Sequence, residues 1–193
     1  MRRGDCITTE RLYLRHWDKA SDGSAFHRLN NDPDVMHFFP GRRTRSESDA
    51  LLDRIEQQIV RNGYSWSAIE LRSTNEIIGF GGIAKVEENF PNGPSAEIGW
   101  RFVPEAWGTG YASEMGKAVL RYGFERLRLP EVLSFAVVAN KKSFAVMKRI
   151  GMQRFEQGDF DHPNIDADKF PKLLRHHCYR LDRSIWQKQK AAE

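Results

Sequence analysis

The sequence predicts a single domain of the mixed α+β class, and three observations carry this prediction. Segments that alternate apolar and polar residues, as strands do, are interleaved with segments whose apolar residues recur every three or four positions, as in helices. In the middle of the chain, a strand passes through a glycine turn directly into a helix. The 193 residues favour one domain, over residues 1–193, because two would each lack a sizeable core.

The first elements are a strand and a helix. Thr8 to Arg15 alternates apolar and polar residues, which predicts a half-buried first strand. Asp18 is a suitable cap for a following helix, and Pro33 ends that helix because helical geometry is disfavoured before proline. A loop that carries Phe38 and Phe39 comes next.

A second helix and a hairpin follow. Residues Ser46 to Asn62 place apolar side chains on one helical face, with Ser46 and Ser48 as capping candidates and Gly63 after the last turn. Two apolar runs joined by turn residues then predict a hairpin, Trp66 to Leu71 with Ile77 to Ile83.

The second half of the chain is expected to alternate between strands and helices. Ala96 to Val103 predicts a strand, and helical spacing begins after Gly108 and Gly110. The later elements are a buried strand at Val132 to Val138, a helix at Asn140 to Ile150, and strands at Gln153 to Gln157 and His177 to Leu181.

Composition excludes several classes of protein. The formal charge is +4, and the basic residues do not form the continuous stripe that nucleic-acid binding requires. No apolar run approaches the ~20 residues of a membrane helix, and the polar start of the chain does not resemble a signal peptide, so we expect a cytoplasmic protein. Cys6 and Cys178 are expected to be buried, reduced thiols. Asp159, Asp161 and His162 lack the count and spacing of metal ligands, so no metal site is expected.

The glycine turn is the segment with the clearest chemistry. Free N–H groups at the start of a helix, together with the helix dipole, form an anion site, so a pyrophosphate could lie over Trp107 to Ala112. A turn that merely packs is the alternative reading of the two glycines. The GxxxxGK pattern of a P-loop is absent, and a dinucleotide-binding turn would follow the first strand rather than lie in mid-chain.

These segments resemble the GNAT acetyltransferase superfamily, in particular its RimJ/RimL-like branch. The resemblance rests on the order of elements and spans about Thr8 to Leu181; it is carried by the motifs TERLYLR, IIGFGGI, AEIGWRFVPEAWGTGYASE, NKKSFAVMKRIGM and FDHP. It implies a strongly twisted mixed sheet of about seven strands with helices on both faces. The strands at Ala96 to Val103 and Val132 to Val138 would splay apart for coenzyme A.

The resemblance also implies binding residues. The pantetheine arm would pair with the main chain of Phe102 and Val103 in the manner of an added strand. Glu105 stands where the family commonly has Gln or Arg, so this side chain is not expected to hold phosphate. The residues expected to bind acetyl-CoA, the acetyl donor, are Trp100, Arg101, Phe102, Val103, Trp107, Gly108, Thr109, Gly110, Tyr111, Ala112, Asn140 and Ser143.

Transfer to an amine requires a base, an oxyanion donor and an acid. Glu97 is the candidate base, with a structural ion pair as the alternative reading. Rigid backbone N–H groups near Trp100 to Phe102 are the candidate oxyanion donors. Many members of the family use a tyrosine as acid where this chain has Met147, which leaves Ser143 or water as the alternative. Asn140 and Ser143 also suit simple helix capping.

The expected function is acetyl transfer from acetyl-CoA to a primary amine, with the acceptor left open between a protein N-terminus and a small molecule. Phe38 and Phe39 lie on a loop that in similar proteins borders the acceptor site, and Glu97 would also face the acceptor. A coenzyme-A-binding module that has lost catalysis is the alternative from another class, with Met147 as its support. The chain would be a monomer or a homodimer.

Overall fold

The computed structural model describes residues 6–192, so residues 1–5 of the polar N-terminal segment and residue 193 lie outside the described part. The chain divides into two compact units. The first contains the described residues up to Ala84 together with Gly99–Met115, and the second contains Lys85–Ile98 and the described residues from Gly116 onward. Strands β4 and β5 and helix α3 each contribute residues to both units.

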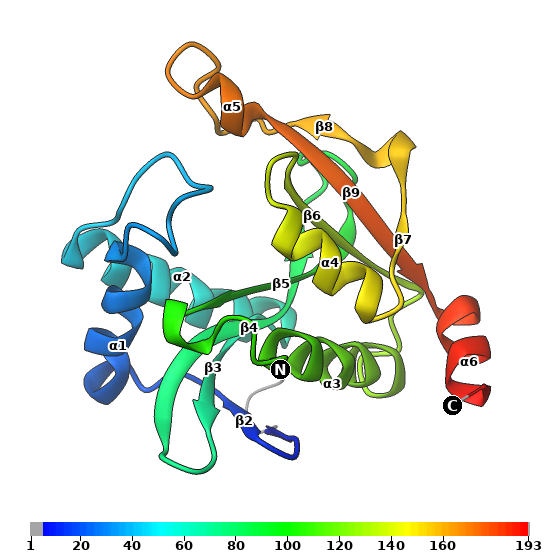
Figure 1. The fold of residues 1–193 in the computed structure, drawn as a ribbon, viewed down its shortest axis with the longest axis horizontal. Coiled ribbons are helices and arrows are strands. Elements are labelled where there is room, and N and C mark those ends of the chain that lie inside the picture. Colours follow the sequence, from blue (N-terminus) through cyan, green and yellow to red (C-terminus); the bar gives the residue numbers. More distant parts are fainter. Residues whose placement is uncertain (1–5, 193) are drawn as a thin grey trace. The chain divides into compact units, whose positions relative to one another are not determined.

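The elements alternate much as the sequence predicts (Figure 1). The strands are β1 (Ile7–Thr8), β2 (Leu12–Arg15), β3 (Trp66–Leu71), β4 (Glu76–Val86), β5 (Ser95–Phe102), β6 (Glu131–Val137), β7 (Gln153–Arg154), β8 (Phe160–Asp161) and β9 (Arg175–Asp182). The α-helices are α1 (Lys19–Asn31), α2 (Arg45–Asn62), α3 (Tyr111–Glu125), α4 (Lys141–Arg149), α5 (Pro171–Leu174) and α6 (Arg183–Ala191), with short 3-10 turns at η1 (Pro104–Ala106) and η2 (Glu156–Gly158).

The sheet of the first unit is antiparallel in the order β1-β2-β3-β4. The backbone N–H of Val103, just after β5, donates to the Ile78 carbonyl of β4 at 2.9 Å. Gly79 makes this approach possible, because a Cβ atom there would lie 2.5 Å from the Arg101 carbonyl oxygen. The predicted hairpin of β3 and β4 is confirmed, and Ile69 is fully buried in it.

The predicted first strand is interrupted. Thr8 belongs to β1, whereas Leu12 begins β2, and the two short strands pair with each other. The Thr9 N–H donates to the Leu12 carbonyl at 2.9 Å and its hydroxyl accepts from the Leu12 N–H. Periodicity alone did not reveal this turn because Leu12 and Leu14, which carry the alternation, both lie after it in β2.

Helices α1 and α2 pack against each other in the first unit. The Asp18 side chain accepts from the Ala20 N–H and caps α1, as predicted. The capping candidates for α2 were wrong: Thr44 is the N-cap, in a reciprocal capping box with Glu47. Thr44 satisfies the helix start one residue before Arg45, so Ser46 and Ser48 already lie inside the helix.

The second unit is centred on β9, which pairs antiparallel with the whole length of β6, from Glu131 opposite Asp182 to Val137 opposite His176. β7 and β8 also pair with β9. β5 pairs with β6 in parallel through one register pair, Glu97 with Leu133. Because this pair is parallel and the others are antiparallel, the sheet is mixed. A pairing this short is consistent with strands β5 and β6 that splay apart. The predicted α+β class is confirmed.

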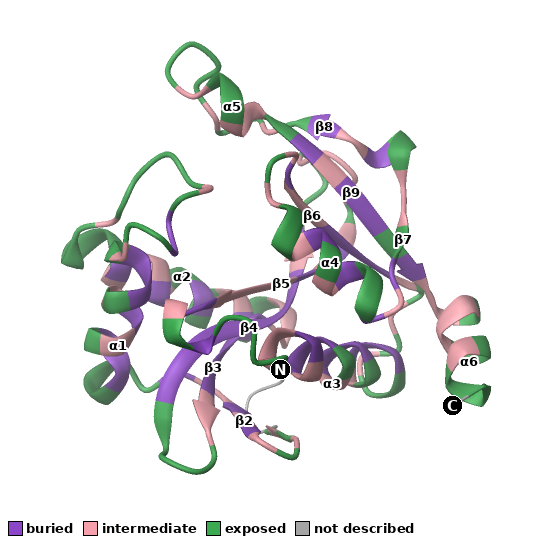
Figure 2. Ribbon diagram, in the orientation of Figure 1, coloured by how far each residue is buried: buried purple, intermediate pink, exposed green. Residues whose placement is uncertain are grey.

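The last part of the chain contains elements that the sequence analysis did not name. β9 is longer than predicted, and helix α6 follows it, with Trp186 stacked on Phe124 of α3 at a centroid distance of 5.1 Å. Burial follows the same plan: β4 is mostly buried, and the loop between α1 and α2 is mostly exposed (Figure 2). None of the described helices combines the length and the apolar character needed to cross a bilayer.

Candidate active site

The glycine turn of the first unit connects β5 to α3 and is held by its own hydrogen bonds. The Trp107 indole donates to the Phe102 carbonyl at 2.9 Å, and the Thr109 hydroxyl donates to the Ala106 carbonyl at 2.7 Å. Gly108 and Gly110 adopt φ values of 76° and 89°. These angles lie in the left-handed region, where a Cβ atom is strained, so the chain needs glycine at both positions.

The backbone of this turn is open to a ligand. A Cβ atom at Gly108 would meet nothing within 4 Å, and one at Gly110 would meet only the Arg11 guanidinium. Within the described residues, no backbone carbonyl accepts from the N–H groups of residues 108–112, whereas those of Ser113 and Glu114 donate to the Gly110 carbonyl. Five successive free donors at a helix start, with the dipole of a 15-residue helix behind them, form a site for an anion.

Arg11 is a residue that the sequence analysis did not connect with this turn. Its guanidinium donates to the Thr109 carbonyl at 3.0 Å, pairs with Glu114 at 2.7 Å and lies 4.5 Å from the Tyr111 ring centroid. Its position in the alternating first strand pointed to solvent, and the only signal of a special role was its place in the TERLYLR motif. Glu105, by contrast, is exposed and takes no part in these contacts.

The backbone N–H and carbonyl groups of strand β5 point alternately to its two edges, and some of them are already hydrogen-bonded. The Val103 N–H is used by the Ile78 carbonyl, and the Phe102 carbonyl accepts the Trp107 indole. Because successive residues of a strand point their backbone groups to opposite edges, the groups of Trp100 and Phe102 lie on the edge away from β4. Of the two residues expected to pair with a ligand, Val103 already uses its backbone N–H within the sheet, whereas Phe102 directs its own toward the other edge.

Arg101 and the loop with Phe38 and Phe39 come together in the first unit. The Arg101 guanidinium lies 4.0 Å from the Phe39 ring centroid and 4.9 Å from that of Phe80, and it donates to the Asn30 side chain of α1. Phe39 is 39% exposed, and Phe38 is partly buried beside His37. The aromatic loop is thus attached to β5 through Arg101.

Glu97 lies in the second unit, where its carboxyl has no hydrogen bond or ion pair to any described residue. It is partly buried, and burial raises its pKa to about 8. The ion pair considered for Glu97 is not observed. A carboxyl without partners whose pKa lies near neutrality has the properties of a general base.

Cys178 lies opposite Phe135 on the neighbouring strands β9 and β6. Burial first, with the Asp159 charge next and a smaller contribution from Glu97, raises the pKa of the Cys178 thiol to about 12. This thiol therefore stays protonated and is a poor nucleophile. Both cysteines are free, but Cys6 is exposed, so its expected burial was wrong.

Asn140 and Ser143 begin helix α4, also in the second unit. The Asn140 side chain accepts from the Ser143 N–H at 3.2 Å and caps the helix, so the capping role is observed. The Ser143 side chain is partly buried, and Met147, one helical turn later, is 2% exposed. Phe144 stacks on Tyr179 and His177 of β9 at 5.5 Å and 5.6 Å, which fixes α4 on its strand.

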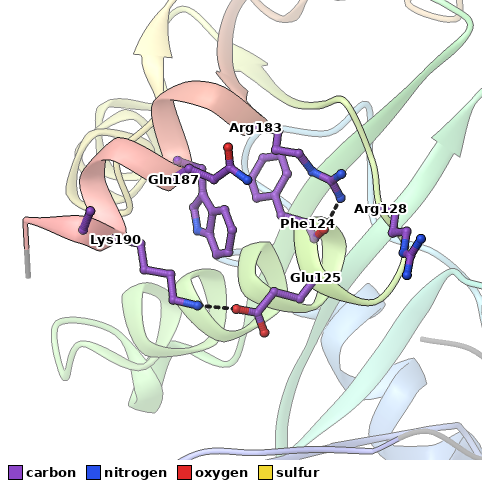
Figure 3. A pocket seen from close by; sticks show the side chains of 8 residues that line it. Phe124, Glu125, Arg128, Arg183, Gln187 and Lys190 are labelled. Carbon is purple, nitrogen blue, oxygen red and sulfur yellow. Dashed lines mark hydrogen bonds and ion pairs between the residues drawn. The ribbon is translucent and has the colours of Figure 1, made fainter.

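One pocket of about 670 Å³ lies elsewhere in the second unit, between the end of α3 and α6 (Figure 3). Two of its polar side chains are held by neighbours: Arg183 donates to the Phe124 carbonyl, and Lys190 pairs with Glu125. None of the predicted site residues lines it. No group of three or more metal-ligating side chains occurs in residues 6–192.

Comparison with known proteins agrees with this geometry. Residues 11–153 match the family model described as "Acetyltransferase (GNAT) domain". The N-acetyltransferase YnaD of Bacillus subtilis (strain 168) is 32% identical over 149 residues, 77% of this chain and 82% of YnaD.

Solved structures show the same fold. A GNAT-family acetyltransferase from Bacillus anthracis superposes with a TM-score of 0.75 at 26% identity, over 93% of this chain and 99% of that one. A spermidine N-acetyltransferase from Vibrio cholerae, solved with CoA and spermine, has a TM-score of 0.70 at 20% identity, over 93% of this chain and 99% of that one. The chain therefore belongs to the GNAT acetyltransferase family and is an N-acetyltransferase.

Proposed function

We propose that this enzyme binds acetyl-CoA at the glycine turn and transfers the acetyl group directly to a primary amine in a ternary complex. The observation that carries the proposal is the row of free N–H groups from Gly108 to Ala112, at the start of α3. These donors suit the pyrophosphate of coenzyme A. The N–H of Phe102, on the edge of β5 away from β4, suits the pantetheine arm.

The reaction forms one bond and breaks one. The amine nitrogen attacks the thioester carbonyl carbon, the N–C bond forms and the C–S bond breaks. Glu97 accepts the proton that the attacking ammonium must lose, and its pKa of about 8 matches that task near neutral pH. A backbone N–H of Trp100 or Phe102 donates to the oxyanion.

The departing thiolate needs one proton. Met147 is buried and has no proton to give, so the Ser143 hydroxyl or a water molecule supplies it. A thiol with a pKa near ~8.5 is a good leaving group, so a weak donor is sufficient.

The acceptor and the setting are part of the same proposal. The acceptor is a protein N-terminal amine, as in the ribosomal-protein branch of the family, or a small amine, and the aromatic loop with Phe38 and Phe39 borders it. The chain acts as one domain in the cytoplasm, as a monomer or homodimer. Support for a single domain comes from the family match, which runs through residues of both units.

The first test is thermal unfolding with and without excess acetyl-CoA, followed by thiol release with a panel of amines and N-terminal peptides. We expect a raised midpoint, because a ligand that binds only the folded state stabilises it, and thiol release with at least one class of amine. An unchanged midpoint at saturating acetyl-CoA would refute the assignment of the glycine turn. A raised midpoint without turnover of any amine would instead indicate a coenzyme-A-binding module.

A further inference from the structure

Arg101 and Arg43, two arginines of the first unit, both hydrogen-bond to Asn30, and neither forms an ion pair with an acidic residue in the described part of the chain. Arg101 of β5 donates to the side-chain oxygen of Asn30, and the backbone N–H of Arg43 donates to the Asn30 carbonyl at 2.8 Å. Asn30 itself is fully buried and donates to the Phe26 carbonyl, so it is rigidly held. The end of α1 therefore positions the Arg101 guanidinium and the backbone of Arg43.

Neither guanidinium has a carboxylate within ion-pair distance among residues 6–192. Arg101 is held by neutral groups: besides Asn30, it contacts the Met36 sulfur at 3.4 Å and the rings of Phe39 and Phe80. The Nε atom of Arg43 is buried and has no hydrogen-bond partner among the described residues. Hydrogen bonds from Thr44, and to a smaller extent the charge of Arg43, lower the pKa of Glu47. The Glu47 carboxylate is not a partner of Arg43, because it accepts from the Thr44 N–H and hydroxyl in the capping box.

Without a bound anion, these two arginine side chains destabilise the folded chain. Burial, and then the positive charge of Arg43, lower the pKa of Arg101 to about 9. An uncompensated cation and an unsatisfied donor both destabilise a folded chain, and a stability role alone would favour apolar residues or an acidic partner. An anion brought by a ligand would relieve both costs at once.

We propose that Arg101 and Arg43 bind a carboxylate carried by the acceptor amine, so that the enzyme acetylates amines that also bear an acid group. A planar guanidinium matches a carboxylate with two parallel hydrogen bonds, and aromatic faces such as those of Phe39 and Phe80 hold it in place. This inference rests on the proposed function, and it gives Arg101 a side-chain role toward the acceptor rather than acetyl-CoA.

The position of Arg101 supports this role. Alternation along β5 places the partly exposed Arg101 side chain on the face of the strand opposite to the buried Phe102 side chain. Phe39, which covers the guanidinium, belongs to the exposed loop after α1. Two cations beside the acceptor would repel a polyamine, so this acceptor class differs from that of the structurally similar spermidine enzyme.

The test compares three acceptors of equal length: 6-aminohexanoate, hexylamine and 1,6-diaminohexane. We expect kcat/KM to be at least tenfold higher for the acid than for hexylamine and lowest for the diamine. In Arg101→Gln and Arg43→Gln, the ratio of acid to hexylamine should fall to about one. Arg101→Lys keeps the positive charge but loses the planar guanidinium, so it should retain part of the preference for the acid. This variant replaces Arg101→Gln in the test if the glutamine variant does not fold.

The matched control is Arg45→Gln. Arg45 is exposed, lies two residues after Arg43 and pairs with Asp49 at 2.9 Å, so its loss should leave the ratio unchanged. Peptides that begin Ala-Glu or Ala-Gln, with amidated C-termini, determine whether an acidic peptide side chain also serves. The same ratio in wild type and Arg101→Gln, or a preference for the diamine, would overturn the proposal.

Two further readouts separate this proposal from the proposed function. If Arg101→Gln raises KM for acetyl-CoA and leaves the acceptor ratio intact, Arg101 serves the acetyl donor and the inference is wrong. Calorimetric binding of 6-acetamidohexanoate, compared with N-hexylacetamide, needs no turnover. Tighter binding of the acid, lost in Arg101→Gln, supports the carboxylate site even if no amine in the panel reacts.

Discussion

Arg11 and Glu114, which are far apart in the sequence, form an ion pair at 2.7 Å that attaches the turn between β1 and β2 to the first turn of α3. The backbone N–H of Arg11 and the Thr9 hydroxyl donate to the same carboxylate at 2.9 Å and 2.6 Å. Because Arg11 also donates to the Thr109 carbonyl, this cluster holds the glycine turn in place.

Removing this carboxylate should loosen the turn. Burial alone would raise the pKa of Glu114, but hydrogen bonds from Thr9 and Arg11 outweigh it and lower the pKa. The stability that Glu114 contributes is therefore present at neutral pH and is lost as pH falls through the lowered pKa of the folded state. We expect Glu114→Gln to reduce the free energy of unfolding at pH 7 by ~1–3 kcal/mol and to weaken acetyl-CoA binding.

Urea unfolding at pH 7 and in acid, together with calorimetry of acetyl-CoA, measures both effects. The difference in the free energy of unfolding between wild type and Glu114→Gln should become smaller in acid, because the wild-type carboxylate is protonated there. An equal difference at both pH values would contradict this account.

The two turn glycines should be intolerant of alanine for a backbone reason. At Gly108 no atom would contact a new Cβ, so any cost of Gly108→Ala comes from the positive φ alone, ~1–2 kcal/mol. A turn that relaxes from this strain moves its N–H donors, so the Kd of acetyl-CoA should rise. Gly108→Asn should be milder because asparagine tolerates this region.

Gly41→Ala is the matched control for the alanine variant. Gly41 also has open space where its Cβ would lie, but its φ is outside the left-handed range. Fluorescence titration of acetyl-CoA should show wild-type affinity for Gly41→Ala. Equal affinities for Gly108→Ala and Gly41→Ala would mean that the turn geometry is unimportant for binding.

The pH dependence of turnover should follow Glu97. With a pKa of about 8, the carboxyl is mostly protonated at pH 7, so kcat/KM should rise with pH and level off above about pH 8. Glu97→Gln should lower kcat/KM by ~100-fold or more and remove this rise. Glu87→Gln, an exposed carboxylate on the loop after β4, should change neither.

The free energy of unfolding should change with pH in the opposite direction to kcat/KM. Since the pKa of Glu97 is raised in the folded state, its favourable effect on folding is present in acid and is lost as pH rises through about 8. Glu97→Gln should therefore be more stable than wild type at pH 9 and similar at pH 5, as thermal unfolding would show. A variant that is less stable at pH 9 would indicate a structural role for the carboxylate.

Ser143→Ala should slow turnover without abolishing it. The Ser143 N–H, not its hydroxyl, completes the Asn140 cap, so this variant keeps the helix start and tests the hydroxyl alone. Asn140→Ala removes the cap and should cost ~1 kcal/mol of stability. Steady-state thiol release at saturating acetyl-CoA is the measurement, and a wild-type rate would remove Ser143 from the mechanism.

Local patterns predicted the elements well where one interaction determines each end. Asp18 at the start of α1 and Gly63 after α2, with a φ of 81°, act through their own backbone neighbours. The split of the first strand, in contrast, depends on Thr9 and Leu12 closing a turn that leaves the apolar alternation unchanged.

The candidate site was predictable as far as it consists of one continuous segment. Glu97 and the residues of the glycine turn lie within 16 positions of one another and carry a motif. The hydrogen bond of Arg101 with Asn30 joins β5 to a helix end more than fifty residues earlier, and no local pattern encodes such a contact.

The stacking of Trp186 on Phe124 has an optical consequence. Of the five tryptophans, Trp186 alone belongs to the second unit, whereas Trp17, Trp66, Trp100 and Trp107 belong to the first. A Trp186→Phe variant would emit only from the first unit, and a variant that keeps Trp186 alone would emit only from the second. Coincident fluorescence transitions in the two variants would show that both halves melt as a single cooperative body.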